Sequence, residues 1–310
     1  MRQLPILLLL LLPVLALAQA GKVKKKDLER LRSAETELAG IAYTMHTDSN
    51  AERRFAACKQ LIPGLVEALK VTNSFNYPLD DLKGVAVRYA PDRSFRTITW
   101  ELHISRDEYR HYGAIQFNEK KLKMRPLLDR SDTWRANPEN VVAGADNWLG
   151  YVIYDLQPGG EIDGSPYYFV YGYDRHSGFV RRKVLDVLSF DAYGKVQFGL
   201  PVFMTYSAEG LLLAERARII LDYSAEANVV LKPDPITGRI VYENLIMMPA
   251  SEDSGPLQMP DGSYHALEYN TEDGKWYEAE KIFTHKYESA PIEVPAERTS
   301  GKDILGRGGR

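Results

Sequence analysis

The sequence is poor in cysteine. Cys58 is the single cysteine among 310 residues. An intramolecular disulfide is therefore excluded, and so is a lipoprotein anchor, because no cysteine lies where a signal peptide would be cleaved. Cys58 falls on the apolar stripe of a predicted helix, so we expect a buried, unreactive thiol rather than a nucleophile. Packing must then stabilise the fold without covalent cross-links.

The sequence also lacks a large excess of charge of either sign, and it lacks long apolar runs after residue 20. The formal net charge is −3, and basic residues form no clustered footprint of the kind that binds nucleic acid. We therefore expect no nucleic-acid partner. Beyond residue 20, no apolar stretch approaches the roughly 20 residues that a membrane-spanning helix needs. We expect no transmembrane segment in the mature chain.

The N-terminus has the composition of a secretory signal peptide. Arg2 precedes an apolar run from Leu4 to Leu17, and small residues follow up to Ala20. The run is shorter than a bilayer requires, which argues against the alternative of a retained anchor. The pattern predicts cleavage after Ala20, with Ala18 as the alternative, and export to the periplasm or the cell exterior.

Motifs for catalysis and for metal binding are missing. The sequence contains no Gly-x-Ser-x-Gly elbow, no His-Glu-x-x-His and no glycine-rich phosphate loop. Asp80-Asp81 and Asp261-Gly262-Ser263 lack calcium-loop spacing and are interpreted as turns. His103 and His111 flank a predicted hairpin loop and are interpreted as solvated strand residues. We therefore predict no cofactor and no metal site. A glycosidase carboxylate pair cannot be chosen from 42 acidic residues, because such a pair meets only in three dimensions.

Helical periodicity covers residues 21–76. Apolar residues recur at spacings of three and four, as in Leu28, Leu31, Leu38, Ala42 and Met45, with Glu35 interrupting the stripe. The tetrapeptide Ser49-Asn50-Ala51-Glu52 matches a capping box and predicts the start of a second helix. Pro63 lies inside that helix and is expected to kink it or to restart it.

From Leu82 onward the apolar period changes to two. About a dozen short segments bounded by turn residues predict antiparallel strands. The expected fold is mainly β (α+β overall): an antiparallel sandwich, barrel or curved sheet preceded by an N-terminal helical pair. The predicted divisions are a signal peptide at 1–20, a helical segment at 21–76, an antiparallel β domain at 77–288 and a disordered tail at 289–310.

Several stretches resemble a pattern found in exported β-rich proteins of Gram-negative bacteria that have no assigned function. The pattern includes Tyr89-Ala90-Pro91-Asp92, residues 95–100 and 112–116, and the stretches 148–155, 171–174 and 183–190. The resemblance implies one domain across roughly residues 75 to 285. It implies no activity, and it places Trp148, Tyr154, Tyr173 and Asp174 in the more characteristic stretches.

A candidate ligand-binding face follows from the aromatic residues and one loop. Nineteen tyrosines outnumber ten phenylalanines, and tyrosine suits stacking surfaces as well as half-buried strands. The loop from Asp174 to Gly178 combines an acid, a base and a histidine, and loops carry function more often than sheet faces do. The hypothesis is that one face contains Trp148, Tyr154, Tyr173, Asp174 and His176. It requires Trp148 on a strand beside the 167–173 strand; otherwise each residue has an ordinary turn or strand role. No catalytic residue is assigned.

These observations favour an exported, non-enzymatic protein that binds an envelope protein or a glycan. The alternative is a secreted hydrolase acting on glycans, and a third possibility is a structural component of the envelope. An enzyme should have a cleft in which carboxylates, or a histidine and a carboxylate, converge with perturbed pKa values. A binding module should have an exposed aromatic or apolar patch of several hundred Å².

Overall fold

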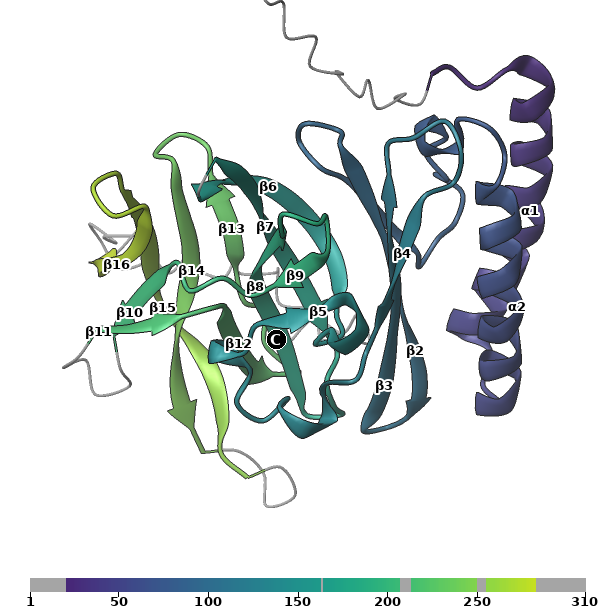
Figure 1. The fold of residues 1–310 in the computed structure, drawn as a ribbon. Coiled ribbons are helices and arrows are strands. Elements are labelled where there is room, and N and C mark those ends of the chain that lie inside the picture. The colour runs from purple at the N-terminus through teal and green to yellow at the C-terminus, as the bar shows by residue number, and fades with distance from the viewer. Residues whose placement is uncertain (1–20, 163, 207–212, 250–254, 283–310) are drawn as a thin grey trace, which may run out of the picture.

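A computed structural model describes residues 21–162, 164–206, 213–249 and 255–282. The expected signal peptide and the expected C-terminal tail lie outside these residues. The described chain forms four layers, with a helical pair followed by three β-sheets (Figure 1). The fold is therefore mainly β with two N-terminal helices, as predicted.

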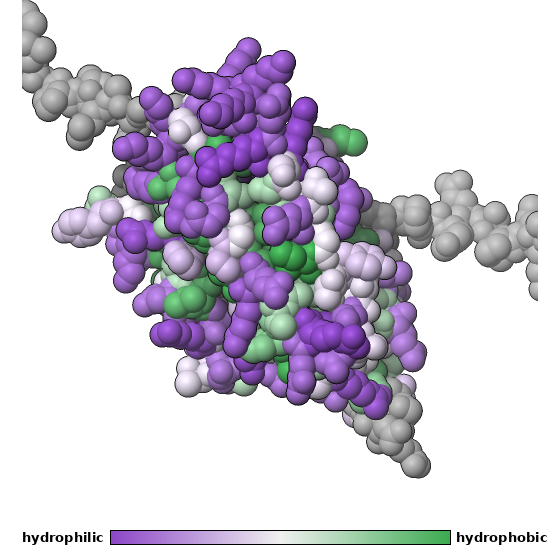
Figure 2. Space-filling view, turned by 90° about the vertical axis from the view of Figure 1, so that its right-hand side faces the viewer, coloured by the Kyte–Doolittle hydropathy of each residue, from purple (hydrophilic) through white to green (hydrophobic). Residues whose placement is uncertain are grey.

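The helical layer contains α1 (Lys25–Thr47) and α2 (Ala51–Leu69). The side chain of Asn50 accepts a hydrogen bond of 3.1 Å from the backbone N–H of Arg53, so α2 begins one residue later than the capping-box pattern predicts. The helix continues through Pro63, and the predicted restart at that residue is wrong. On the outer face, apolar side chains lie among hydrophilic ones (Figure 2). None of the described helices is both long and apolar enough to span a bilayer.

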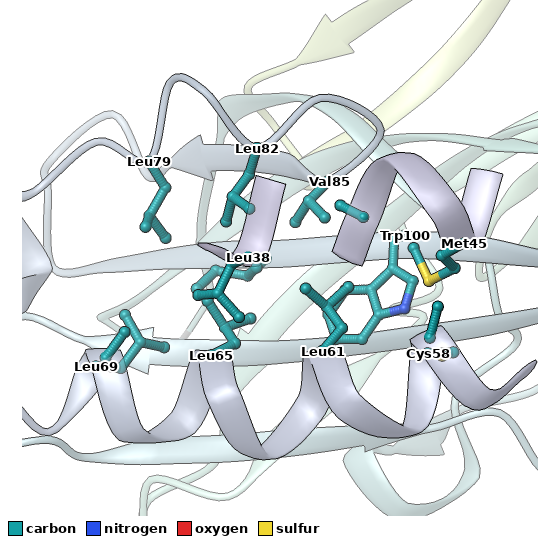
Figure 3. Packing of buried hydrophobic residues seen from close by; sticks show 14 of the residues in the cluster. Leu38, Met45, Cys58, Leu61, Leu65, Leu69, Leu79, Leu82, Val85 and Trp100 are labelled. Carbon is teal, nitrogen blue, oxygen red and sulfur yellow. The ribbon is translucent and has the colours of Figure 1, made fainter. Parts of the chain in front are cut away.

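The first sheet has the order β1-β2-β3-β4, with β1 (Ala86–Tyr89), β2 (Phe95–Ser105), β3 (Glu108–Phe117) and β4 (Met124–Leu128). Trp100 and Leu102 on β2 pack under the helices, where Leu38, Leu61 and Cys58 also lie (Figure 3). The predicted burial of Cys58 is confirmed. Glu35 is also buried, and its carboxylate is satisfied there because it accepts hydrogen bonds from the Tyr77 hydroxyl and from the Asp81 N–H.

The middle sheet is covered on both faces. Its order is β5-β9-β8-β7-β6, with β12 also pairing with β8. Along β7, Tyr168 and Val170 pack toward the first sheet, while Tyr167, Phe169 and Tyr171 pack toward the third. The strands are β5 (Ala143–Gly144), β6 (Val152–Ile162), β7 (Ser165–Asp174), β8 (Val180–Phe190), β9 (Val196–Phe198) and β12 (Ile219–Ser224).

The third sheet closes the other side of the molecule. Its order is β11-β10-β16-β15-β14-β13, and β10 and β16 form its one parallel pair within the described chain. The strands are β10 (Phe203–Tyr206), β11 (Leu213–Arg216), β13 (Leu231–Asp234), β14 (Arg239–Met248), β15 (Leu257–Asn270) and β16 (Lys275–Ile282). Short 3-10 turns occur at η1 (Ser74–Asn76), η2 (Ser131–Thr133), η3 (Pro138–Asn140) and η4 (Ala145–Asn147).

The strand predicted to start at Trp148 begins later. β6 starts at Val152, and Trp148 lies in the segment between η4 and β6. Its side chain is fully buried between the first and middle sheets, with its ring 5.1 Å from that of Tyr151 in an edge-on contact. Trp148 therefore belongs to the core.

Candidate functional site

A pocket of about 650 Å³ lies beside the first half of β3. The segment that follows β4 and the loop that follows β7 complete its walls. All six consecutive residues from Asp107 to Tyr112 line the pocket. Successive side chains of a strand point to opposite faces of the sheet, so six neighbours in one wall mean that the pocket borders the edge of β3.

His111 is the buried centre of this site. It lies on β3 directly opposite Glu101 on β2, and its side chain is 1% exposed. The Nδ1 atom is 3.5 Å from an Asp129 carboxylate oxygen, and Nε2 is 3.4 Å from one of Asp174. Both ring nitrogens therefore face acids.

Arg135 joins the same two acids. Its Nη2 donates to both oxygens of Asp129 at 2.8 and 3.0 Å, and its Nη1 donates to Asp174 at 3.1 Å. Nη2 also donates to the backbone carbonyl of Leu149 at 2.6 Å. A planar guanidinium suits this bridging role because its donors are fixed in a fork.

The pKa values of the acids follow from this arrangement. Burial alone would raise the pKa of Asp174, but the hydrogen bond with His176 and the charges of His111 and Arg135 outweigh it and lower that pKa well below its usual range. The pKa of Asp129 is lowered in the same way, against its burial, by His111 and Arg135. Asp129 and Asp174 therefore remain ionised at neutral pH.

Glu101 differs from these two acids. Burial raises its pKa, although Arg175 and His111 both oppose the shift. The Arg175 Nε atom lies 2.8 Å from one carboxylate oxygen of Glu101, and His111 Nε2 lies 4.0 Å from the other. Glu101 thus ties the loop after β7 to the first sheet.

The loop after β7 holds His176 in an unusual backbone conformation. The φ angle of His176 is 58°, which non-glycine residues seldom adopt. Its N–H donates to Asp174 at 2.7 Å, and its Nδ1 lies 3.4 Å from the other oxygen of that carboxylate. The His176 side chain is 30% exposed and lines the pocket. Backbone strain of this kind recurs at functional sites.

Neighbouring groups fix this loop. The Gly178 N–H donates to Asp107 at 2.9 Å, which attaches the loop tip to the turn between β2 and β3. Arg181 donates to the backbone carbonyls of Arg175 and Ser177. The loop is therefore preorganised by contacts from two sheets.

The structure brings together two of the five predicted site residues, Asp174 and His176. Trp148 is buried and does not lie on a strand beside β7, so the required arrangement is wrong. Tyr154 packs toward the third sheet, where its hydroxyl donates to the Leu231 carbonyl at 2.9 Å. Tyr173 and its neighbour Asp174 on β7 point to opposite faces of the middle sheet, and Tyr173 points toward the third sheet, as Tyr154 does. The five residues do not form one face.

Sequence reasoning missed His111, Asp129 and Arg135. His111 was expected to be solvated and is buried among acids. Asp129 and Arg135 belong to a segment rich in turn residues, where composition carries no sign of burial. Among the described residues, no group of three or more His, Cys, Asp or Glu side chains is placed to hold a metal ion.

No protein-family model matches the chain, and no curated protein sequence matches it.

Proposed function

We propose that this is an exported binding protein whose ligand occupies the pocket beside β3. The observation that carries the proposal is His176, held at a positive φ by Asp174 and directed into a polar pocket. A loop fixed by both Asp107 and Arg181 lowers the entropy lost when a ligand binds.

The charges of the site support binding rather than acid–base catalysis. His111 has a carboxylate at each ring nitrogen, and Arg135 holds both carboxylates. Glycoside hydrolysis needs one carboxylic acid that is protonated at working pH. The lowered pKa values of Asp129 and Asp174 make both unsuitable for that role. The pKa of Glu101 is raised, but Glu101 is not among the residues that line the pocket.

A glycan hydrolase remains the second candidate because of one contact. His176 Nδ1 lies 3.4 Å from Asp174, and a carboxylate commonly orients a catalytic histidine in this way. Hydrolysis of fluorogenic glycans that His176→Asn abolishes would favour this candidate. Turnover equal in wild type and variant would come from a contaminant.

A comparative pull-down from envelope extract tests the binding function. The immobilised variants are His176→Asn, which keeps a residue that tolerates positive φ, and Asp132→Asn on the exposed pocket rim. The control is Tyr193→Ala, because Tyr193 is 97% exposed on a distant turn. Mass spectrometry should identify a protein or small molecule retained by wild type and control and depleted in both variants. Equal retention by all four proteins would refute the pocket as the binding site.

Export is part of the same proposal and has its own test. We propose that the mature chain begins at Gly21, whose backbone nitrogen donates to Asn73 at 3.0 Å. A new N-terminal ammonium group keeps this donor. N-terminal sequencing of protein from the periplasm of a Gram-negative host should start at Gly21, whereas an intact Met1 in the soluble fraction would contradict cleavage.

A further inference from the structure

We infer that the ligand of this pocket is an extended, basic peptide segment that pairs with the free edge of β3. The inference rests on the proposed binding function and names the class of ligand.

Along one of its two edges, β3 is paired with a neighbouring strand over only half of its length. β4 pairs with residues Tyr112 to Gln116 of β3. Residues Glu108 to His111 pair with β2 on their other side, but no strand of the described chain pairs with them on the β4 side. This uncovered part of β3 borders the pocket.

The backbone groups of this edge point outward. The Phe117 N–H donates to the Lys123 carbonyl at 2.9 Å, on the β4 side. Backbone groups of a strand alternate between its two neighbours, so the N–H and C=O groups of Tyr109 and His111 point to that same side. Pro126 lies opposite Ala114, where no N–H is required, which agrees with this alternation.

The chain leaves room for another strand at this edge. β4 ends at Leu128, and no later residue of the described chain pairs with β3. Asp132 of the turn η2 lines the pocket. Peptides added to a sheet edge bind through main-chain hydrogen bonds, with alternate side chains giving specificity.

The charges around the pocket favour a basic peptide. Five carboxylates and three guanidinium groups line it. Arg110 pairs with Glu108, and Arg135 pairs with Asp129 and Asp174. The two other lining acids, Asp107 and Asp132, are exposed and have no cationic side-chain partner in the described part of the chain. The third guanidinium group, that of Arg130, is exposed and has no acidic partner there, so two unpaired negative charges face one unpaired positive charge. Lysine or arginine side chains of a bound peptide would complement the two acids.

A phage-displayed library of nine-residue linear peptides provides the probe. Selection should enrich sequences with lysine or arginine, and the strongest binder is then synthesised. In the bound peptide, one set of alternate amides faces β3 and the other set faces away from it. N-methylation of the first set should weaken binding about tenfold or more, because two or more main-chain donors are removed. N-methylation of the second set should have little effect. Acidic sequences, or equal tolerance of N-methylation in both sets, would overturn the inference.

Protein variants test the charge argument. Asp107→Asn with Asp132→Asn should weaken binding of the basic peptide about two- to tenfold, because two exposed attractions are lost. The change keeps an acceptor for the Gly178 N–H, and thermal melting checks that it folds. The control, Glu29→Gln with Glu37→Gln on α1, makes the same charge change at exposed positions and should leave binding unaltered. Equal effects of the two double variants would contradict recognition at this site.

The outcomes separate this inference from the proposed function. If no peptide is enriched while His176→Asn still depletes a component of envelope extract, the pocket binds a ligand of another class and the peptide inference fails. If His176→Asn has no effect on either peptide or extract component, the proposed function fails as well.

Discussion

The Nε2 atom of His111 lies 3.4 Å from the carboxylate of Asp174, although the two residues belong to different sheets. This contact joins β3 of the first sheet to the end of β7 in the middle sheet. Arg135 and Asp129 complete the junction. The pocket wall and the attachment between two layers are thus made by the same charged groups.

Asp174→Asn should reduce the free energy of unfolding by about 3–5 kcal/mol at pH 7, because it leaves Arg135 without one counter-charge and removes a buried carboxylate that contacts His111. Urea unfolding measures the change. Asp80→Asn is the control, since Asp80 is exposed, and should change stability by less than about 0.5 kcal/mol. Equal stability of the two variants would mean that the junction contributes little.

Stability should fall when the pH drops below about 4. The pKa of Asp174 is lower in the folded protein than the unfolded value of about 3.9, so its stabilising contribution is complete above that value and declines as the pH falls. Asp129 contributes in the same direction, whereas the raised pKa of Glu101 opposes it. Between pH 6 and pH 3, the free energy of unfolding measured with urea should fall more steeply with decreasing pH in the wild type than in Asp174→Asn. Parallel profiles would contradict the lowered pKa.

Trp148→Ala should destabilise the protein by about 3–5 kcal/mol, the usual cost of truncating a large buried aromatic residue. Thermal unfolding tests this, with Tyr193→Ala as the exposed aromatic control. An unchanged melting temperature would show that Trp148 is not a core residue.

Cys58→Ala should cost about 1–2 kcal/mol, less than larger core truncations. Cys58 is buried near Trp100, and burial raises the pKa of its thiol. Native protein should therefore react with a thiol reagent only slowly, and urea should accelerate the reaction. Fast labelling of the folded protein would contradict both statements.

Local patterns in the sequence predict much of the fold. The apolar stripe containing Leu31, Leu38 and Met45 predicts α1 and its buried face. The hairpins β3–β4 and β7–β8 follow from alternating residues around polar turns. Two local predictions were wrong, the restart of the second helix at Pro63 and the strand starting at Trp148. The helix tolerates Pro63, and Trp148 is buried by packing between sheets rather than by a strand.

The site was less predictable because its residues meet only after the sheets stack. Asp174 and His176 were found because they are neighbours in one loop. Asp129 and Arg135 come from a segment 39 or more positions away from Asp174, and no local spacing links them. The residues around His111 alternate as in any strand, so the local sequence does not distinguish it from an exposed strand residue. Its burial depends on the middle sheet, which packs against β3 only in the folded protein.

Amide hydrogen exchange at the edge of β3 tests the central claim most directly. In the free protein, the amides of Tyr109 and His111 should exchange faster than those of Gly113 and Ile115, which face β4. A saturating amount of the selected basic peptide should slow Tyr109 and His111 about tenfold or more and leave the turn around Tyr193 unchanged. Protection elsewhere, with Tyr109 and His111 unaffected, would contradict a ligand site at this edge.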